Sequence, residues 1–171
     1  MKILFIGGTG NISTACTRLA AEKGMEVFLF NRGRSIDSVP RQAQLIKGDI
    51  RDATSAADAL RRDRFDVVVD WVAYLPEHVE ADIGHFASRT RQYVFISSAA
   101  VCQKPPRHYL VTESTPLENP FWQYARDKIA CVKTARETAR DSFEREITQS
   151  LSKTTHSLSK VAKRLVSDEA P

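Results

Sequence analysis

The fold is decided by the stretch Lys2-Ile3-Leu4-Phe5-Ile6-Gly7-Gly8-Thr9-Gly10-Asn11-Ile12-Ser13 at the start of the chain. Its first part is short, apolar and rich in β-forming residues, which is typical of a strand buried on both faces of a parallel sheet. A turn with three glycines follows directly. A glycine-rich turn between a strand and a helix lets the backbone approach a pyrophosphate, whose charge is stabilised at the helix N-terminus. We therefore predict a dinucleotide site at this turn; the alternative is a tight turn without a ligand.

The residues behind the glycines predict a helix and then a second strand. Gly24 is the expected end of the helix, because glycine readily adopts the left-handed conformation that closes helices. Residues 27–30 are apolar like the first strand. Four residues recur at helical spacing and are expected to form the apolar face of the helix: Ile12, Cys16, Leu19 and Ala20.

The second strand leads into the polar turn Asn31-Arg32-Gly33-Arg34. In NAD-binding folds an acidic residue about 20 positions beyond the glycines accepts hydrogen bonds from the ribose hydroxyls. Here that carboxylate is missing and two arginines are present. Because an arginine can pair with a 2′-phosphate through its planar fork, the turn favours NADP, with NAD as the alternative. A solvated loop with arginines facing water is the other interpretation.

Further along, apolar runs alternate with helical patterns. We predict strands over 43–47, 66–71 and 93–96, and helices over 53–62, 76–88 and 121–140. Asp52 is the expected N-cap of the first of these helices. The connection 99–119 contains prolines, and loops of this length are usually functional or disordered. The alternation predicts an α/β fold, a doubly wound parallel sheet with helices on both faces.

Composition suits one domain of 171 residues with 42% apolar content. The net charge of +4 fits an anionic ligand, but no Lys/Arg run or interleaving of basic and aromatic residues predicts a nucleic-acid surface. Three widely spaced cysteines match neither a disulfide nor a metal pattern. No apolar run matches a signal peptide or a membrane span. We expect a reduced, cytoplasmic protein with no membrane contact.

Two histidines, His78 and His85, lie on one face of the helix predicted over 76–88. No third ligand accompanies them in the sequence pattern. Two surface or packed histidines are therefore favoured over a metal site, and no metal is predicted.

Two motifs resemble those of a known family. Gly7-x-x-Gly10-x-x-Ser13 is similar to the GxxGxxG fingerprint of extended short-chain dehydrogenases/reductases, the NAD(P)-dependent epimerase/dehydratase family, with Ser13 replacing the third glycine. Tyr124-x-x-x-Lys128, with Ser98 upstream at a strand end, is similar to the active-site region of that family. The resemblance covers residues 1–139 and implies an NAD(P)-binding Rossmann fold.

The resemblance implies catalytic roles for Ser98, Tyr124 and Lys128. Tyr124 would be the acid/base of a hydride transfer, Lys128 its activator and a ribose ligand, and Ser98 a hydrogen-bond partner of the substrate oxygen; Ser97 is the alternative serine. A free tyrosine is a poor base near pH 7, and an ammonium one helical turn away favours the phenolate. The other interpretation is a surface turn and an ordinary strand-end serine.

The resemblance also implies which residues hold the cofactor. Asp49 and Ile50 would lie over the adenine. Val72 and Ala73 follow the strand predicted over 66–71, at the edge where open α/β folds bind their ligands. The predicted cofactor residues are Gly7, Thr9, Gly10, Asn11, Ile12, Asn31, Arg32, Arg34, Asp49, Ile50, Val72, Ala73, Tyr124 and Lys128.

Members of this family continue with a smaller substrate domain, which residues 141–171 do not resemble. We assign 1–140 to an NAD(P)-binding domain and 141–171 to a helical or partly disordered tail, as though the chain had lost its C-terminal half. Turnover of the isolated chain is then expected to be weak, unless the tail or a second subunit in a homodimer supplies the missing walls.

The leading hypothesis is an NAD(P)-dependent epimerase, dehydratase or reductase that acts on a nucleotide sugar or a similar hydroxyl or keto substrate. The alternatives are a non-catalytic NADP-binding or RNA-associated regulatory module, or an inactive fragment. The catalytic residue types favour descent from an enzyme, and the missing substrate domain favours the alternatives.

Overall fold

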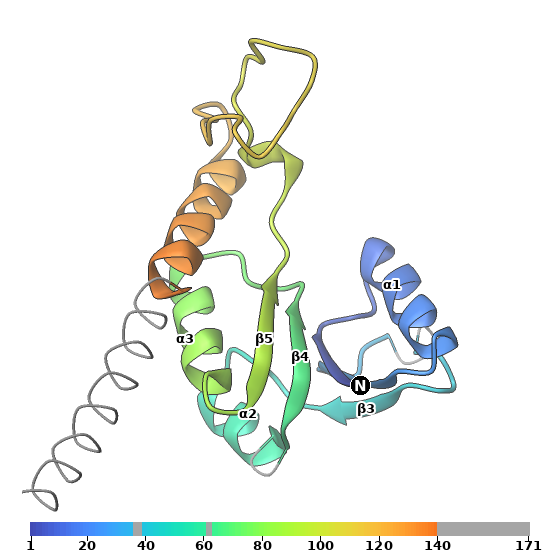
Figure 1. Ribbon diagram of the computed structural model, residues 1–171. Helices are drawn as coiled ribbons and strands as arrows, with labels where there is room; N and C mark the ends of the chain where they lie inside the picture. The colour runs from blue at the N-terminus through green and yellow to red at the C-terminus, as the bar shows by residue number, and fades with distance from the viewer. Residues whose placement is uncertain (36–38, 61–62, 140–171) are drawn as a thin grey trace, which may run out of the picture. The chain divides into compact units, whose positions relative to one another are not determined.

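The computed structural model describes residues 1–35, 39–60 and 63–139. Its first compact unit, Met1–Ala135, contains the whole sheet (Figure 1). A helix over residues 123–139 follows the loop that begins after a short 3-10 turn, η2, at Ala99–Val101. The other elements are β1 (Lys2–Ile6), α1 (Asn11–Glu22), β2 (Glu26–Asn31), β3 (Gln44–Lys47), α2 (Ala53–Leu60), β4 (Phe65–Asp70), α3 (Pro76–Phe86) and β5 (Thr90–Phe95).

The five described strands form one parallel sheet in the order β3-β2-β1-β4-β5. The chain runs outward from β1 to β3, returns across the sheet, and continues with β4 on the other side of β1. The carboxyl ends of β1 and β4 therefore lie next to each other where the strand order reverses, which is where ligands bind in open α/β sheets.

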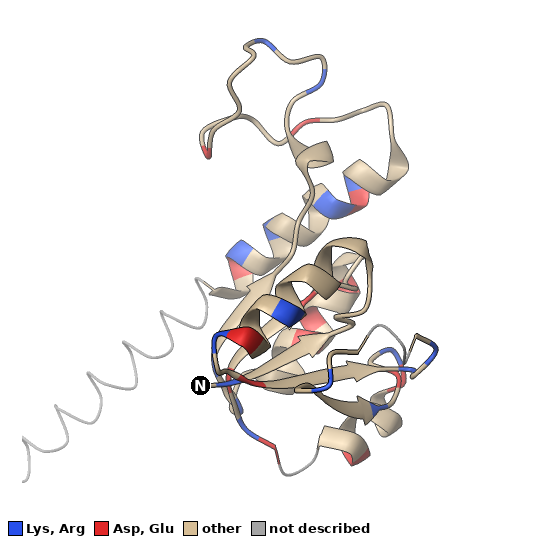
Figure 2. Ribbon diagram, turned by 90° about the vertical axis from the view of Figure 1, so that its right-hand side faces the viewer, with Lys and Arg blue, Asp and Glu red and all other residues tan. Residues whose placement is uncertain are grey.

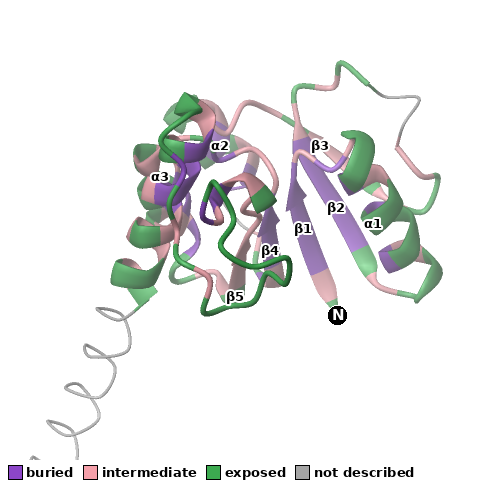
Figure 3. Cartoon of the chain, turned by 90° about the horizontal axis from the view of Figure 1, so that it is seen from above, coloured by how far each residue is buried: buried purple, intermediate pink, exposed green. Residues whose placement is uncertain are grey.

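Helices cover both faces of the sheet, which confirms the doubly wound α/β prediction. Figure 3 shows the buried strands between α1 on one side and α2 and α3 on the other. The side chains of β1 alternate accordingly: Leu4 and Ile6 pack in a cluster with α2, and Ile3 and Phe5 pack in a cluster with α1. Both sets are buried, so β1 is apolar on both faces from Ile3 to Ile6.

The prediction for the apolar face of α1 was right for Ala20 and wrong for Ile12, Cys16 and Leu19, which are exposed. Ile12 is 74% exposed and Leu19 is 53% exposed, whereas Ser13, Thr17 and Ala20 face the sheet. Small residues are needed there because the helix crosses close to the glycine turn. Thr17 Oγ1 lies 2.9 Å from the carbonyl oxygen of Gly8, a distance that a larger apolar side chain would not allow.

Most predicted boundaries differ from the observed ones by one to three residues at an end. Asp52 is confirmed as the N-cap of α2, because its carboxylate accepts hydrogen bonds from the backbone N–H groups of Thr54 and Ser55. Gly24 is confirmed behind α1, with φ +75°. The predicted tail, 141–171, lies outside the described residues. Within the described part of the chain, no helix is long and apolar enough to cross a membrane.

Candidate functional site

A pocket of about 810 Å³ lies at the carboxyl ends of the central strands. It is bounded by the loops that follow β1, β2, β3 and β4 and by the first turns of α1 and α3. Of the predicted cofactor residues it is lined by Gly7, Thr9, Gly10, Asn11, Ile12, Asn31, Arg32, Arg34, Asp49, Ile50 and Val72.

The glycine turn forms the floor of the pocket. Gly7 has φ +98°, and a Cβ placed on it would meet Val72 Cγ1 at 3.0 Å. Gly8 has φ +80°, and its Cβ would come within 2.5 Å of Leu29. Both positions therefore require glycine.

Gly10 is the N-cap of α1, so no cap side chain occupies the N–H groups of the first helical turn. These N–H groups and the positive end of the helix dipole suit an anionic group. The pocket therefore fits a dinucleotide with its pyrophosphate at this turn.

Asn31 connects the glycine turn to the arginine turn. Its Nδ2 donates to the carbonyl oxygen of Gly7 at 2.9 Å, and its Oδ1 accepts from the N–H of Gly33 at 2.8 Å. A carboxylate at this position could accept from Gly33 but could not donate to Gly7. The missing acidic residue is thus explained by a structural role of the amide.

Three arginines line the pocket: Arg32 and Arg34 behind β2, and Arg51 behind β3. Arg32 and Arg34 are exposed, and neither takes part in the ion pairs found among the described residues. Arg51 pairs with Asp82 of α3. Along the helices, basic and acidic positions are interspersed (Figure 2).

Asp49 and Ile50 both line the pocket. One oxygen of Asp49 accepts from the N–H of Arg51 at 3.0 Å, and the N–H of Asp49 donates to Ser55 Oγ. These bonds fix the loop behind β3 in its course along the pocket.

Ala73 and the predicted catalytic residues do not line this pocket. Ala73 is fully buried, and its carbonyl oxygen accepts a hydrogen bond from Lys128 Nζ at 2.8 Å. Ser98 is half-buried and its Oγ accepts from the N–H of Ala100, which caps η2. Ser97 Oγ is buried and has no hydrogen-bond partner among the described residues.

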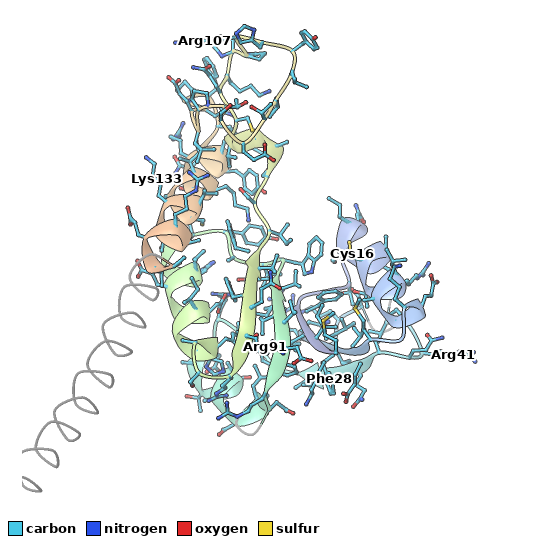
Figure 4. The ribbon with its side chains drawn as sticks, in the orientation of Figure 1. Cys16, Phe28, Arg41, Arg91, Arg107 and Lys133 are labelled. Carbon is cyan, nitrogen blue, oxygen red and sulfur yellow. The ribbon has the colours of Figure 1, made fainter. Side chains whose placement is uncertain are left out.

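Lys128 connects the helix over 123–139 to the ends of β4 and β5. Its ammonium, in a residue that is 2% exposed, donates to the carbonyl oxygens of Ala73 and Ile96 at 2.8 Å each. Burial lowers the pKa of Lys128 from its usual value. By contrast, Lys133 of the same helix is exposed and points away from the sheet (Figure 4).

Tyr124 is half-buried between two aromatic rings. Its ring centroid lies 4.8 Å from that of Trp122 and 6.4 Å from that of Tyr74, and Tyr74 lines the pocket. Tyr124 thus contacts a pocket-lining ring, while Lys128 bonds the backbone of Ala73, next to Val72, and of Ile96, two residues before Ser98.

Some pocket residues were missed by the sequence analysis. His78 was predicted to be a surface or packed histidine rather than a pocket residue; its Nδ1 accepts from the N–H of Tyr74, and burial lowers its pKa. Among the described residues no cluster of potential ligands could hold a metal ion. The missed residues that directly follow a predicted strand could have been found from that position in the sequence. The missed residues are Gly8, Ser13, Phe30, Ser35, Gly48, Arg51, Trp71, Tyr74 and His78.

The sequence of this chain is similar to those of known proteins. Residues 3–85 match the NAD dependent epimerase/dehydratase family. A UDP-glucose 4-epimerase from Lactobacillus helveticus is 28% identical over 153 residues, which cover 78% of this chain and 46% of the relative. A chloroplast stem-loop binding protein of 41 kDa from Arabidopsis thaliana is 32% identical over 116 residues, which cover 60% of this chain and 30% of that protein.

Solved structures share the fold. The UDP-glucose 4-epimerase from Brucella ovis in complex with NAD superposes with a TM-score of 0.69 at 20% identity, covering 81% of this chain and 47% of that one. The chain thus spans about half the length of the epimerases it matches, and a smaller share of the stem-loop binding protein.

Proposed function

Since residues 3–85 belong to the NAD-dependent epimerase/dehydratase family, we propose that this chain binds a nicotinamide dinucleotide and uses it to oxidise or reduce a hydroxyl or keto carbon of a nucleotide sugar or similar substrate. The observation that carries the proposal is the glycine-floored pocket at the point where the strand order reverses. The NAD in the Brucella ovis structure and the UDP-sugar chemistry in the name of the Lactobacillus relative support it.

We further propose that NADP is preferred over NAD. Arg32 and Arg34 are exposed at the pocket and unpaired among the described residues, so either guanidinium is free to meet a 2′-phosphate. The side chain of Asn31 is occupied by Gly7 and Gly33. The ribose therefore meets no carboxylate there, and the repulsion that would exclude a phosphate is absent.

The chemistry would be carried by Tyr124, Lys128 and Ser98. When bound, the dinucleotide supplies or accepts the hydride. Tyr124 would move the hydroxyl proton, with the charge of Lys128 favouring its phenolate. Ser98 would donate its hydroxyl hydrogen to the substrate oxygen while its Oγ continues to accept from the N–H of Ala100. The 171 residues span less than half of the Lactobacillus and Brucella epimerases, so we propose that these residues by themselves orient a substrate poorly and turn it over weakly.

Cofactor affinity tests the first part of the proposal. Calorimetric titration with NADPH and NADH should give tighter binding of NADPH. Arg32→Ala should remove the preference, a loss of about 1.5–3 kcal/mol for a charge-assisted hydrogen bond. Arg41→Ala is the matched control, because Arg41 is exposed away from the pocket (Figure 4). Equal affinities in the unmutated chain would contradict the NADP preference, and no binding of either cofactor would contradict the function.

Turnover tests the second part. NADPH-dependent reduction, or epimerisation of a UDP-sugar, should be weak and should disappear in Tyr124→Phe with cofactor affinity retained. Activity that survives Tyr124→Phe would exclude this tyrosine as the acid/base.

A second candidate function is RNA association, and the observation that favours it is the 32% identity to a stem-loop binding protein. It predicts that stem-loop RNA binds this chain, either in competition with the dinucleotide or together with it. A gel-shift titration with and without NADPH distinguishes this from a purely enzymatic role.

A further inference from the structure

A buried polar network joins α3 to the strand ends beneath the dinucleotide pocket. We propose that Asp70 and Asp82 are positioning residues for this pocket: Asp70 holds the Val72–Ala73 backbone, and Asp82 holds the Arg51 wall. The inference rests on the proposed dinucleotide binding, which it deepens. It concerns residues outside both sequence motifs.

Asp70 is the centre of the network. It is fully buried at the end of β4, and its Oδ1 accepts from the N–H groups of Val72 at 2.8 Å and Ala73 at 3.0 Å. Its Oδ2 accepts from the hydroxyl of Tyr93 in β5 at 2.6 Å. These bonds hold the turn behind β4, and Val72 of that turn lines the pocket beside Gly7.

Asp82 approaches Asp70 from α3. It is 1% exposed and hydrogen-bonds both the carboxyl of Asp70 and the guanidinium of Arg51. Burial, and then the hydrogen bond and charge of Asp70, raise the pKa of Asp82 to about 8 against the opposing effect of Arg51. A proton is therefore retained near neutral pH, and one arginine balances one remaining negative charge.

The other titratable groups that face Asp70 and Asp82 do not supply a proton in place of the one on Asp82. Tyr93 keeps its own, because burial and the charge of Asp70 raise its pKa. Burial lowers the pKa of His78 in α3, so His78 is neutral in the alkaline range. Lys128 interacts with Asp70 from the helix over 123–139, and burial lowers its pKa.

Loss of the proton on Asp82 would place two carboxylates in contact in a buried site with a single ion-paired arginine. Like charges in such a site repel strongly. The repulsion acts between α3, which carries the pocket-lining His78, and the end of β4, which leads into the pocket-lining Val72 and Tyr74. Asp82 also pairs with the pocket-lining Arg51. Dinucleotide affinity should therefore fall as pH rises through the pKa of Asp82.

The test is a calorimetric titration with NADPH from pH 6.5 to 9.5, in buffers of different ionisation enthalpy. One-proton linkage allows at most a tenfold loss of affinity per pH unit above the pKa. We expect a loss of about tenfold or more by pH 9.5, with proton uptake on binding. Asp82→Asn has no carboxyl to ionise at this position, so its affinity should not fall with rising pH, whatever its affinity at pH 7.

Several outcomes would overturn the inference. A flat profile in the unmutated chain would do so, as would a loss that persists unchanged in Asp82→Asn, since Lys128 would then be the titrating group. If Asp82→Asn does not fold, ¹³C NMR of the Asp carboxyls in the unmutated chain decides, because an Asp82 that is fully ionised at pH 6 contradicts the retained proton. Absence of NADPH binding at every pH would instead refute the dinucleotide function, and the positioning role with it.

Discussion

Asn31 provides the sharpest test of how the pocket is built, through the substitution Asn31→Asp. The new side chain has nearly the same shape and introduces the acidic residue that NAD-binding folds carry in this turn. It can still accept from the N–H of Gly33, but when ionised it cannot donate to the carbonyl oxygen of Gly7. We therefore expect loss of stability instead of a simple exchange of NADP for NAD.

The size of the effect follows from two oxygen atoms that then face each other: the new carboxylate oxygen at position 31 and the carbonyl oxygen of Gly7. The lost hydrogen bond contributes about 0.5–1.5 kcal/mol, and leaving the Gly7 carbonyl unsatisfied in a partly buried turn costs about 1–3 kcal/mol. The sum is about 1.5–4.5 kcal/mol, or on the order of 10 °C in Tm for a unit of this size. The loss should depend on pH: the introduced carboxyl can donate to Gly7 when it is protonated, so its pKa is raised in the folded state. The difference from the unmutated chain is therefore smallest below about pH 4 and grows as pH rises through that pKa.

Thermal and urea unfolding followed by circular dichroism, from pH 4 to 7.5, measure this effect. Asn11→Asp is the matched control, because it adds the same charge to the same pocket at an exposed position in the first turn of α1. A negative charge there is favourable to the helix dipole, so this variant should be unchanged or slightly stabilised. An Asn31→Asp protein as stable as the control at pH 7 would refute the argument that Asn31 holds the two turns together.

Three further predictions follow from other parts of the site. Gly10→Val should fold, since Gly10 has φ −85° and ψ 175° and a Cβ there meets only Ser13 Oγ at 3.4 Å, but it should lose dinucleotide affinity; unchanged affinity would place the site elsewhere. Lys128→Met should lower the free energy of unfolding by about 2–4 kcal/mol, because two carbonyl oxygens lose their donor. The control Lys133→Met should change it by less than about 0.5 kcal/mol. Similar effects of the two substitutions would contradict a stabilising role of the Lys128 hydrogen bonds. The pKa of Asp82 is raised from 3.8 to about 8, so its stabilising contribution is complete below about pH 4 and lost as pH rises to about 8, at up to about 1.4 kcal/mol per pH unit; urea unfolding of Asp82→Asn should lack this slope.

The sequence by itself determined the features that depend on neighbouring residues. The apolar run Lys2–Ile6, the glycines behind it and the Asp52 cap were all predicted and observed, because strand propensity, positive φ and N-capping act within a few residues. The parallel arrangement of the strands, with helices on both faces of the sheet, was predicted from strands that alternate with helices. The pocket-lining residues of the two turns were predicted for the same reason, since chain adjacency alone places Gly10 and Arg32 at the sheet edge.

Only the tertiary structure decided which side chains meet across long separations. The face of α1 that packs on the sheet was misassigned because close approach to Gly8 outweighs apolar periodicity, so Thr17 is buried and Ile12 is exposed. The bond from Lys128 to the carbonyl oxygen of Ala73 joins positions that no local pattern relates. The same holds for Asp82, whose pKa and partners depend on burial between α3 and β4, and burial is a property of the packed elements rather than of the residues around it in the chain.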